Sequence, residues 1–386
     1  MFSHVSDCFQ QSLHLAQKSI FLSPPNPAVG CVLVSPAGKV IAQGHTQAVS
    51  GAHAEIMALH EAAANGESTL GATAYVTLEP CSHYGRTPPC CNALIEAKVA
   101  KVVIALLDPN PLVAGKGVEL LQKAGIAVEV LPVDHPQAVA AKELMIGFFS
   151  RMVRGRPWVR IKNAASLDGH TALQNGQSQW ITSAAARDDG HAWRARASAI
   201  LTGVGTVLAD DPSLDVRAVP TQRQPHVVIV DSELKTPVTA KIFTINSIAA
   251  QAINTPARGI FIYTTSNDFV NKTALENAGA TVIVLPAEDT SGKVNLRLMM
   301  QDLAKREVNE LHVEAGATLN GALISAGLVD EFLVYVAPKF LGAGRGMADL
   351  PVLADLNQAA AFEFVSVDKV GDDLRILGRI TALDAF

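Results

Sequence analysis

The alternation of short apolar runs with helix-forming stretches constrains the fold of this chain more than any other feature. The apolar runs at residues 72–78 and 101–107 are strand-length, whereas residues 54–64 and 117–124 favour helices. Strands and helices that alternate require crossover connections, which produce a largely parallel sheet covered by helices. The sequence therefore predicts an α/β fold.

Two such units are predicted in succession. The length of 386 residues suits two or three domains of about 150 residues each. Residues 151–157 (R-M-V-R-G-R-P) follow an expected helix at 135–149, and we interpret them as a solvated linker between domains at 1–150 and 151–386. In the second unit we expect strands at 158–164, 198–202, 226–231, 259–264, 280–285, 311–314 and 331–337, helices near 184–195, 295–305 and 317–326, and a terminal hairpin over 362–380.

Charge and hydropathy exclude several classes of protein. Lysine and arginine together number 31 and aspartate and glutamate 36, which gives a net charge of −5. A mildly acidic chain is not expected to coat nucleic acid or an anionic membrane surface. No apolar run approaches the roughly 18–20 residues of a membrane-spanning helix, and the first residues lack a signal-peptide pattern. We expect a cytoplasmic protein with neither nucleic acid nor a membrane as its partner.

The five cysteines point to a metal site, because all of them lie within the first 91 residues. His53, Cys81 and Cys90 would supply one imidazole and two thiolates, which is a three-ligand zinc site with its fourth position left for water. Zinc lowers the pKa of such a water to about 7. Glu55 follows His53 by two residues and can carry a proton from that water to a departing amine. Cys90 would begin a helix, whose positive end favours a thiolate.

The spacing of these residues leaves one alternative. Zinc-dependent nucleobase deaminases are marked by H-x-E…P-C-x-x-C, whereas eight residues separate Cys81 from Cys90 in this chain. A closed structural zinc with Cys91 or His83 as the fourth ligand is the alternative, and it leaves Glu55 without a role. We interpret Cys91 as a small core residue, since neighbouring helical residues point apart.

Several motifs resemble those of one family, the bifunctional deaminase–reductases of riboflavin biosynthesis. In the first half they are residues 79–91 (E-P-C-S-H-Y-G-R-T-P-P-C-C), 26–31 (N-P-A-V-G-C) and 108–111 (D-P-N-P). In the second half they are residues 166–169 (S-L-D-G), 178–182 (S-Q-W-I-T), 208–212 (L-A-D-D-P), 313–316 (V-E-A-G) and 337–339 (A-P-K). The longer cysteine spacing is this family's form of the zinc motif.

The resemblance implies a cytidine-deaminase-like domain followed by a dihydrofolate-reductase-like domain. It implies two consecutive reactions on a small phosphorylated pyrimidine. The first is zinc-dependent deamination of 2,5-diamino-6-ribosylamino-4(3H)-pyrimidinone 5′-phosphate. The second is reduction of the ribosyl group to ribityl with NADPH. A homodimer or homotetramer is also implied.

The family further implies which residues contact the ligands. The deaminase substrate contacts would be Asn26, His45, His83, Arg86, Asp108 and Asn110, with Arg86 suited to the phosphate. The alternative for each is a loop residue bonded to backbone. The NADPH contacts would be Ala164, Trp180, Thr206, Asp210, Ser232, Gly316, Ala317, Thr318, Leu319, Asn320, Gly321 and Ala322. The reductase substrate contacts would be Ser178, Arg194, Leu214, Arg217 and Glu314.

Local patterns support parts of this assignment. A strand at residues 311–314 runs through Gly316 into a helix, an arrangement that favours phosphate binding. Asp210 is the expected proton donor in the reduction, and Lys162 is the alternative. Trp180 has core packing as its alternative role.

Two other functions share part of the pattern. A deaminase of cytidine nucleotides, or of bases in nucleic acid, would share the H-x-E motif but leaves the second unit unexplained. A structural zinc domain joined to a nucleotide-sensing domain leaves Glu55 idle.

Overall fold

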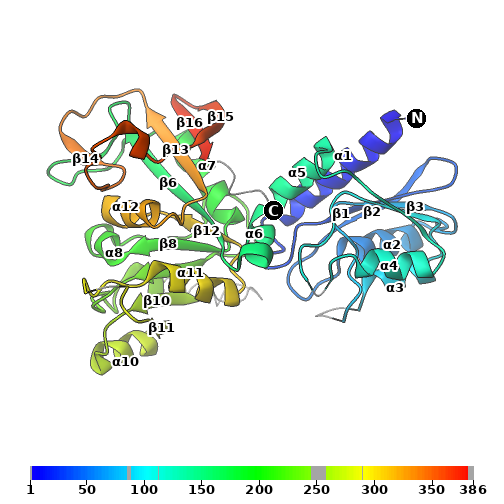
Figure 1. The fold of residues 1–386 in the computed structure, drawn as a ribbon, viewed down its shortest axis with the longest axis horizontal. Helices are drawn as coiled ribbons and strands as arrows, with labels where there is room; N and C mark the ends of the chain where they lie inside the picture. Colours follow the sequence, from blue (N-terminus) through cyan, green and yellow to red (C-terminus); the bar gives the residue numbers. More distant parts are fainter. Residues whose placement is uncertain (1, 85–87, 112, 245–257, 289, 381–386) are drawn as a thin grey trace. The chain divides into compact units, whose positions relative to one another are not determined.

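The computed structural model describes residues 2–84, 88–111, 113–244, 258–288 and 290–380. The chain divides into two compact units, Met1–Arg154 and Gly155–Phe386, each built as an α/β structure (Figure 1). Within the described residues, none of the helices combines the length and apolar character that crossing a membrane requires.

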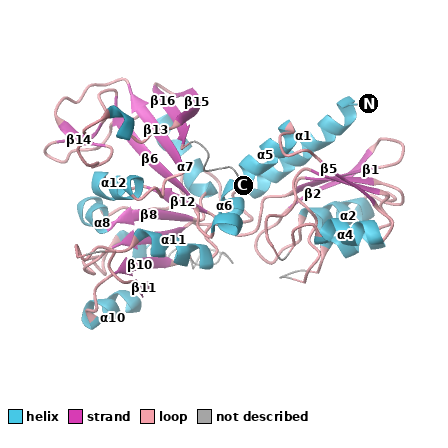
Figure 2. Cartoon of the chain, viewed as in Figure 1, coloured by secondary structure: helices cyan, strands magenta, loops and turns pink. Residues whose placement is uncertain are grey.

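The first unit has a five-stranded sheet in the order β2-β1-β3-β4-β5. Its strands are β1 (Gly30–Val34), β2 (Val40–His45), β3 (Thr73–Val76), β4 (Lys101–Ile104) and β5 (Ala127–Val130). Strand β1 is antiparallel to β2 and β3, whereas β3, β4 and β5 are parallel. The helices are α1 (Phe2–Ser19), α2 (Ala54–Ala64), α3 (Cys90–Glu96), α4 (Lys116–Lys123), α5 (Pro136–Leu144) and α6 (Ile146–Arg154). Figure 2 shows α1 and α5 on one side of the sheet and α2 and α4 on the other.

The end of the first unit differs from the prediction in two ways. The single helix expected over residues 135–149 is two helices, because the backbone at Met145 leaves helical geometry (φ −116°, ψ 16°). The second of them, α6, continues to Arg154 and buries Phe148 and Phe149. Arg151 and Arg154 therefore belong to a packed helix, and the interpretation of residues 151–157 as a solvated linker is wrong for them.

The second unit has a nine-stranded sheet in the order β11-β10-β9-β8-β12-β6-β13-β16-β15. Its strands are β6 (Trp158–Ser166), β8 (Ala199–Gly203), β9 (His226–Val230), β10 (Ile260–Thr264), β11 (Ala280–Val284), β12 (Glu310–Val313), β13 (Glu331–Ala337), β15 (Glu363–Val370) and β16 (Asp373–Arg379). The seven predicted strands and the terminal hairpin are thereby confirmed. All neighbours are parallel except β13–β16 and β16–β15.

The remaining elements of this unit include several that the sequence did not suggest. The three predicted helices are present as α7 (Ala184–Arg196), α11 (Leu296–Lys305) and α12 (Ala317–Ser325). The unpredicted elements are α8 (Val204–Asp210), α10 (Phe269–Asn277), the 3₁₀ turn η1 (Leu356–Gln358), and a small sheet of β7 (His170–Leu173) and β14 (Gly344–Gly346). Both missed α-helices are short, and α10 leaves Phe269 and Val270 exposed rather than presenting a clear apolar stripe.

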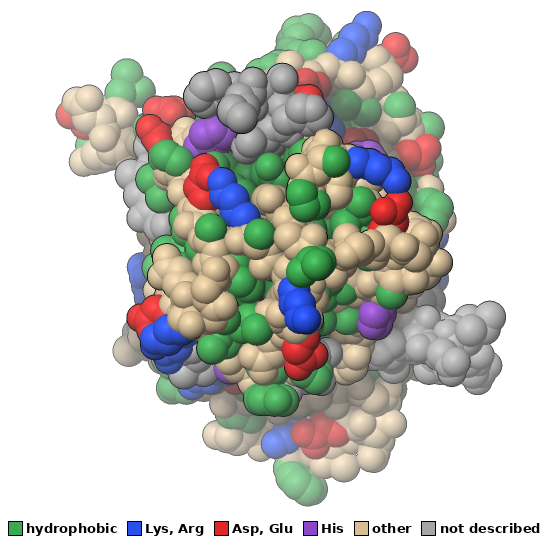
Figure 3. All heavy atoms as spheres, turned by 90° about the vertical axis from the view of Figure 1, so that its right-hand side faces the viewer, with side chains coloured by type: hydrophobic (Ala, Val, Ile, Leu, Met, Phe, Trp, Pro, Cys, Tyr) green, Lys and Arg blue, Asp and Glu red, His purple; other side chains and the backbone are tan. Residues whose placement is uncertain are grey.

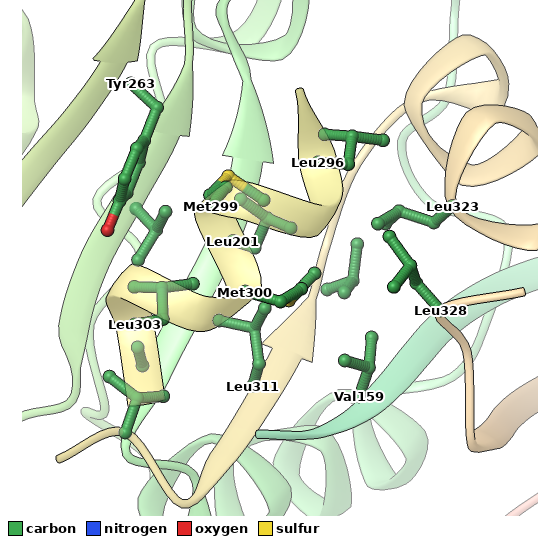
Figure 4. Close-up of a cluster of buried hydrophobic side chains, with 14 of the residues drawn as sticks. Val159, Leu201, Tyr263, Leu296, Met299, Met300, Leu303, Leu311, Leu323 and Leu328 are labelled. Carbon is green, nitrogen blue, oxygen red and sulfur yellow. The ribbon is translucent and has the colours of Figure 1, made fainter. Parts of the chain in front are cut away.

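Helix α11 shows how the core of this unit forms. Leu296, Met299, Met300 and Leu303 recur at helical spacing and are all buried. Figure 4 shows these side chains pointing toward Leu201 of β8, Leu311 of β12 and Val159 of β6. Residues that alternate with these along the strands point to the opposite face of the sheet. There Ile200 of β8 belongs to a second buried cluster with Val207 of α8 and Leu275 of α10. The parallel sheet is therefore buried on both faces.

The path of the chain predicts a ligand crevice at the carboxyl edge of the sheet. Strand β8 leads through α8 to β9, in one direction across the sheet, whereas β12 leads through α12 past β6 to β13, in the other. Helices α8 and α12 consequently belong to opposite layers. A ligand crevice is expected outside the carboxyl ends of neighbouring strands that part in this way.

Replacing Leu303 with alanine is expected to destabilise the second unit by about 2–5 kcal/mol, because its side chain is fully buried in the α11 core. All three tryptophans, Trp158, Trp180 and Trp193, belong to this unit, so their fluorescence during urea unfolding of the full chain reports on it alone. Leu356→Ala is the control, since that leucine is 91% exposed and should change stability by less than about 0.5 kcal/mol. Equal shifts for the two variants would contradict the packing described.

Candidate active sites

Three elements of the first unit bring the expected zinc ligands together. His53 immediately precedes α2, Cys81 follows β3, and Cys90 is the first residue of α3. The His53 Nδ1 atom lies 3.7 Å from Cys81 Sγ and 3.3 Å from Cys90 Sγ. The three ligand atoms all lie within 4.8 Å of one another. Tetrahedral zinc with metal–ligand distances of about 2.0–2.3 Å holds neighbouring ligand atoms at similar spacing.

The protonation of the two thiols also suits a cation. The Cys90 thiol donates to Cys81, which lowers the pKa of Cys81 to about 4 and raises that of Cys90. The pair therefore shares one proton, and a cation that replaces it meets two thiolates and an imidazole. This is the donor set of a catalytic zinc with three protein ligands. The residues present fit zinc.

The geometry argues against a closed four-ligand site. Cys91 is fully buried, and its thiol donates to the carbonyl oxygens of Pro80 (3.2 Å) and Gly117 (3.6 Å). Its predicted place in the core is confirmed. His83 is exposed, and the group of potential ligands found among the described residues comprises His53, Cys81 and Cys90. Arg86 lies outside the described residues.

Glu55 lies in the first turn of α2 and is 4% exposed. Burial, together with the neighbouring Cys81 charge, raises the pKa of Glu55 to about 7. A carboxyl group in this state can both accept and release a proton near neutrality. Its position two residues after a ligand places that capacity beside the metal site.

Strand pairing brings the other expected deaminase contacts to the same edge of the sheet. Residue pairs Gly30–His45 and Cys31–Val76 align the end of β2 and the start of β1 with the end of β3. The parallel partner β4 ends beside β3 and leads to Asp108. The segment before β1 carries Asn26. The four residues Asn26, His45, Asp108 and Asn110 thus flank the loop that carries Cys81.

Local bonds fix the orientation of these side chains. The His45 Nδ1 atom lies 3.1 Å from Ser19 Oγ. Asp108 accepts from the Asn110 amide at 2.8 Å. Burial raises the pKa of Asp108 to about 6 against the opposing effect of that amide.

Sequence reasoning gave no role to one residue of this unit, Glu79, although it begins the motif at residues 79–91. Its carboxylate is 3% exposed and accepts backbone amides from the segment that begins at Asp108. The available signal was an acidic residue directly before the P-C pair at a strand end, where a buried carboxylate needs several donors.

In the second unit, Glu314 and Arg194 form the centre of a polar cluster. Arg194 Nε and Nη2 lie 2.5 and 2.7 Å from the two Glu314 oxygens, and Arg194 Nη1 donates to the Asp215 carbonyl at 3.0 Å. Burial opposes ionisation, but the Arg194 guanidinium holds the pKa of Glu314 well below its usual range. Burial lowers the pKa of Lys162, whose charge interacts with both residues. Three of the expected residues therefore meet here, namely Arg194, Glu314 and Lys162. The loop that carries Leu214 and Arg217 joins them through the Asp215 carbonyl.

Ser178 and Trp180 line a separate shallow pocket of about 230 Å³ with Lys339 and Leu341. Trp180 is 65% exposed, and the Arg187 guanidinium lies 4.5 Å from its ring centre. Trp180 is thus a surface residue, and its alternative role in core packing is wrong. Lys339 holds this loop by donating to the Ile181 carbonyl at 2.8 Å.

The start of α12 fits a phosphate-bearing cofactor. Its N-cap, Gly316, has no side chain to accept from the first helical amides. Asn320 is 1% exposed, and its Nδ2 donates to Asn163, Ala315 and Met347. Its Oδ1 has no partner among the described residues. A cofactor with phosphates and hydrogen-bond donors meets both needs.

The other expected cofactor contacts lie at varying distances from α12. The first turn of α12 lies close to the end of β8, because the Leu319 side chain is 3.5 Å from the position that a Cβ atom on Gly203 would take. Thr206 lies in α8, the helix that follows β8. Ser232 lies two residues after the end of β9 and accepts from the Val294 amide, and Ala164 packs beside Tyr335. Asp210 is exposed at the end of α8, and within the described residues no hydrogen bond or ion pair joins it to Glu314 or Lys162.

Both units match families of known proteins. The cytidine and deoxycytidylate deaminase zinc-binding region matches residues 3–106, and the RibD C-terminal domain matches residues 157–376. The riboflavin biosynthesis protein RibD of Escherichia coli K12 is 44% identical over 368 residues, which cover 94% of this chain and 96% of that protein. The solved structure of Acinetobacter baumannii RibD, form 1, is 38% identical with a TM-score of 0.85 and covers 99% of this chain and 100% of its own. The chain belongs to the RibD family.

A more distant solved structure agrees. The deaminase/5-amino-6-(5-phosphoribosylamino)uracil reductase from Thermotoga maritima is 29% identical with a TM-score of 0.82 and covers 98% of this chain and 99% of its own. Membership of the RibD family confirms the expected fold class, a cytidine-deaminase-like domain followed by a dihydrofolate-reductase-like domain. The family's two cofactors, zinc and NADPH, are those expected from the sequence.

Neighbouring cysteines of this RibD family member provide a sharp test of the metal site. Cys90→Ala should abolish stoichiometric zinc binding, because it removes one of three ligands. Cys91→Ala should keep zinc, because that thiol bonds to backbone carbonyls instead. Metal analysis of the purified full-length variants measures both outcomes. Equal zinc content in the two variants would show that the ligand assignment is wrong.

Proposed function

We propose that this chain performs two consecutive steps of riboflavin biosynthesis. The first is hydrolytic deamination of 2,5-diamino-6-ribosylamino-4(3H)-pyrimidinone 5′-phosphate, and the second is reduction of its ribosyl group to ribityl. The observation that carries the proposal is the three-ligand site with the buried Glu55 beside it, in a chain whose other unit is the RibD reductase domain. Domains at 1–150 and 151–386 would carry the two steps.

In the deamination, zinc supplies the Lewis acid that activates a water molecule. Glu55 would take one proton from that water and pass it to the ring nitrogen. It would then take the second proton, from the hydroxyl group added to the ring carbon, and pass it to the amino group, which leaves as ammonia. Its burial favours this role, because the carboxyl group can change its charge near neutral pH. Asn26, His45, Asp108 and Asn110 at the same sheet edge would bind the pyrimidine, with His83 and Arg86 completing the pocket.

In the reduction, NADPH supplies the hydride. The start of α12, from Gly316 to Ala322, would hold its phosphates, with Ala164, Trp180, Thr206, Asp210 and Ser232 as further contacts. Ser178, Arg194, Leu214, Arg217 and Glu314 would bind the sugar phosphate. Arg194 is already engaged by Glu314, so Arg217, which is 60% exposed and paired with Asp215, is the better phosphate partner. Asp210 would move the proton that opens the ribose ring, with Lys162 as the alternative.

The net charge of −5 and the charge pattern of one face favour a small-molecule substrate rather than nucleic acid. On the face drawn in Figure 3, lysine and arginine side chains lie beside acidic ones instead of gathering into one positive area. A nucleic-acid-binding surface needs such an area. A cytoplasmic location is part of the proposal, because reducing conditions preserve the thiolates, and the five cysteines are free.

A coupled assay on the zinc-loaded full chain tests both steps, following ammonia release and NADPH oxidation together. Wild-type protein should release ammonia before it consumes NADPH. Glu55→Gln should lower ammonia release by about 10²–10⁴-fold and leave reduction of the supplied deaminated product intact. Asp210→Asn should do the reverse, slowing NADPH oxidation alone.

Each failure has a separate meaning. Ammonia without NADPH oxidation would refute the reductase step, and neither signal with zinc present would refute the whole proposal. Full reductase activity in Asp210→Asn would remove Asp210 from the mechanism and leave Lys162.

We also propose that copies of the chain associate through β15, as a homodimer or within a homotetramer. Strand β15 is the last of its sheet, and Phe364, Val365 and Val367 on it are 65%, 49% and 54% exposed. An apolar edge strand is suited to pairing with a second copy. Val367→Lys should convert the assembly to single chains in sedimentation equilibrium, whereas Leu70→Lys, at another exposed site, should not. A wild-type protein that sediments as one chain would refute the proposal.

A further inference from the structure

The Glu79 carboxylate is committed to backbone hydrogen bonds. It follows β3, two residues before the ligand Cys81, and is 3% exposed. Its Oε2 accepts from the amides of Asp108 (3.2 Å) and Gly115 (3.0 Å), and its Oε1 from those of Gly117 (2.9 Å) and Val118 (3.2 Å). An ionised carboxylate offers about four acceptor positions, so these bonds fill it.

The four amides belong to two different segments. One is Asp108, which begins the loop with Asn110 and accepts from the Asn110 amide. The others lie in the N-cap and first turn of α4, where Gly115 has no side chain to cap the helix. Glu79 caps it from the end of another element, with a negative charge at the positive helix end. One side chain therefore fixes both segments relative to the end of β3.

Gly117 shows how closely these segments are packed. A Cβ at this position would lie 2.3 Å from the Pro80 carbonyl oxygen and 2.9 Å from Glu79 Oε1. Any side chain there would push α4 away from residues 79–81. The Cys91 thiol, which donates to the carbonyls of Pro80 and Gly117, joins the adjoining start of α3 to the same assembly.

We propose that Glu79 is a positioning residue of the deaminase site, holding residues 108–110 in their substrate-binding place relative to the metal ligands. The inference rests on the proposed function, in which Asp108 and Asn110 contact the pyrimidine. Glu79 acts through these residues and not on the substrate, because its acceptor positions are filled by amides.

The first test replaces Glu79 with glutamine, whose amide nitrogen cannot accept from two of the four amides. The KM for the diaminopyrimidine ribotide should rise about 10–100-fold through the displaced loop, with a much smaller change in kcat. Zinc content and reductase activity should stay at wild-type levels. Glu119→Gln is the matched control, since this glutamate in the first turn of α4 is exposed and pairs with Lys123.

Gly117→Ala provides an independent route, because it separates α4 from an intact Glu79. It should reproduce the rise in KM, and the double variant should show less than the sum of the two effects. Hydrogen exchange of residues 108–118 should accelerate in both single variants. If Glu79→Gln does not fold, Gly117→Ala and its exchange pattern decide the question.

An unchanged KM in Glu79→Gln with zinc bound would overturn the inference. So would loss of zinc from both variants, because Glu79 would then support Cys81 rather than the substrate loop. A wild-type chain that releases no ammonia refutes the proposed function instead, so the two failures are distinguishable.

Discussion

Parallel strand pairing is the constraint on which both candidate sites depend. Parallel neighbours send their carboxyl ends to one edge, so the loops after β3 and β4 meet in the first unit, and those after β8, β12 and β6 meet in the second. The expected zinc ligands Cys81 and Cys90, together with Asp108, Glu314 and Gly316, follow such strand ends, whereas His53 follows β2, which is antiparallel to β1. Short strands of four or five residues suffice, because the helices between them bury both faces.

Buried ion pairs connect the amino ends of three strands in the second sheet. Arg160 of β6 is 1% exposed and bonds to Glu310 of β12 and Glu331 of β13, while Arg196 and Arg379 bond to the same carboxylates. Buried charges of this kind are strongly destabilising when one partner is removed, although the network itself adds little stability over an apolar core. Its effect is to fix the register in which three strands begin, and thereby where Glu314 and the start of α12 emerge.

The sequence predicted what depends on local pattern and short-range chemistry. The strands of the second unit, the bounds of α2 and the ligand trio follow from apolar periodicity and residue type. Elements set by tertiary packing were not predictable: α8 and α10 lack a distinct apolar stripe, and β7 and β14 pair with each other across a long separation. The break at Met145 was likewise missed, because the apolar residues continue through it and the nearby glycine, Gly147, lies inside α6 rather than at the break.

Buried carboxyl groups in this chain differ in their hydrogen-bond partners. This difference separates the residue proposed to transfer a proton, Glu55, from the residue proposed to hold a loop in place, Glu79. Glu79 accepts four backbone amides, which occupy the acceptor positions of its two oxygens. Glu55 instead lies beside Cys81 and Cys90, and burial raises its pKa to about 7. The two glutamates are nearly equally buried, at 4% and 3% exposure, so burial alone does not identify the catalytic group. Glu55 and Asp108 of this unit are both buried carboxyl groups, and burial raises their pKa values to about 7 and about 6. Position separates them, because Glu55 follows the expected zinc ligand His53 by two residues and therefore fits the proposed proton transfer.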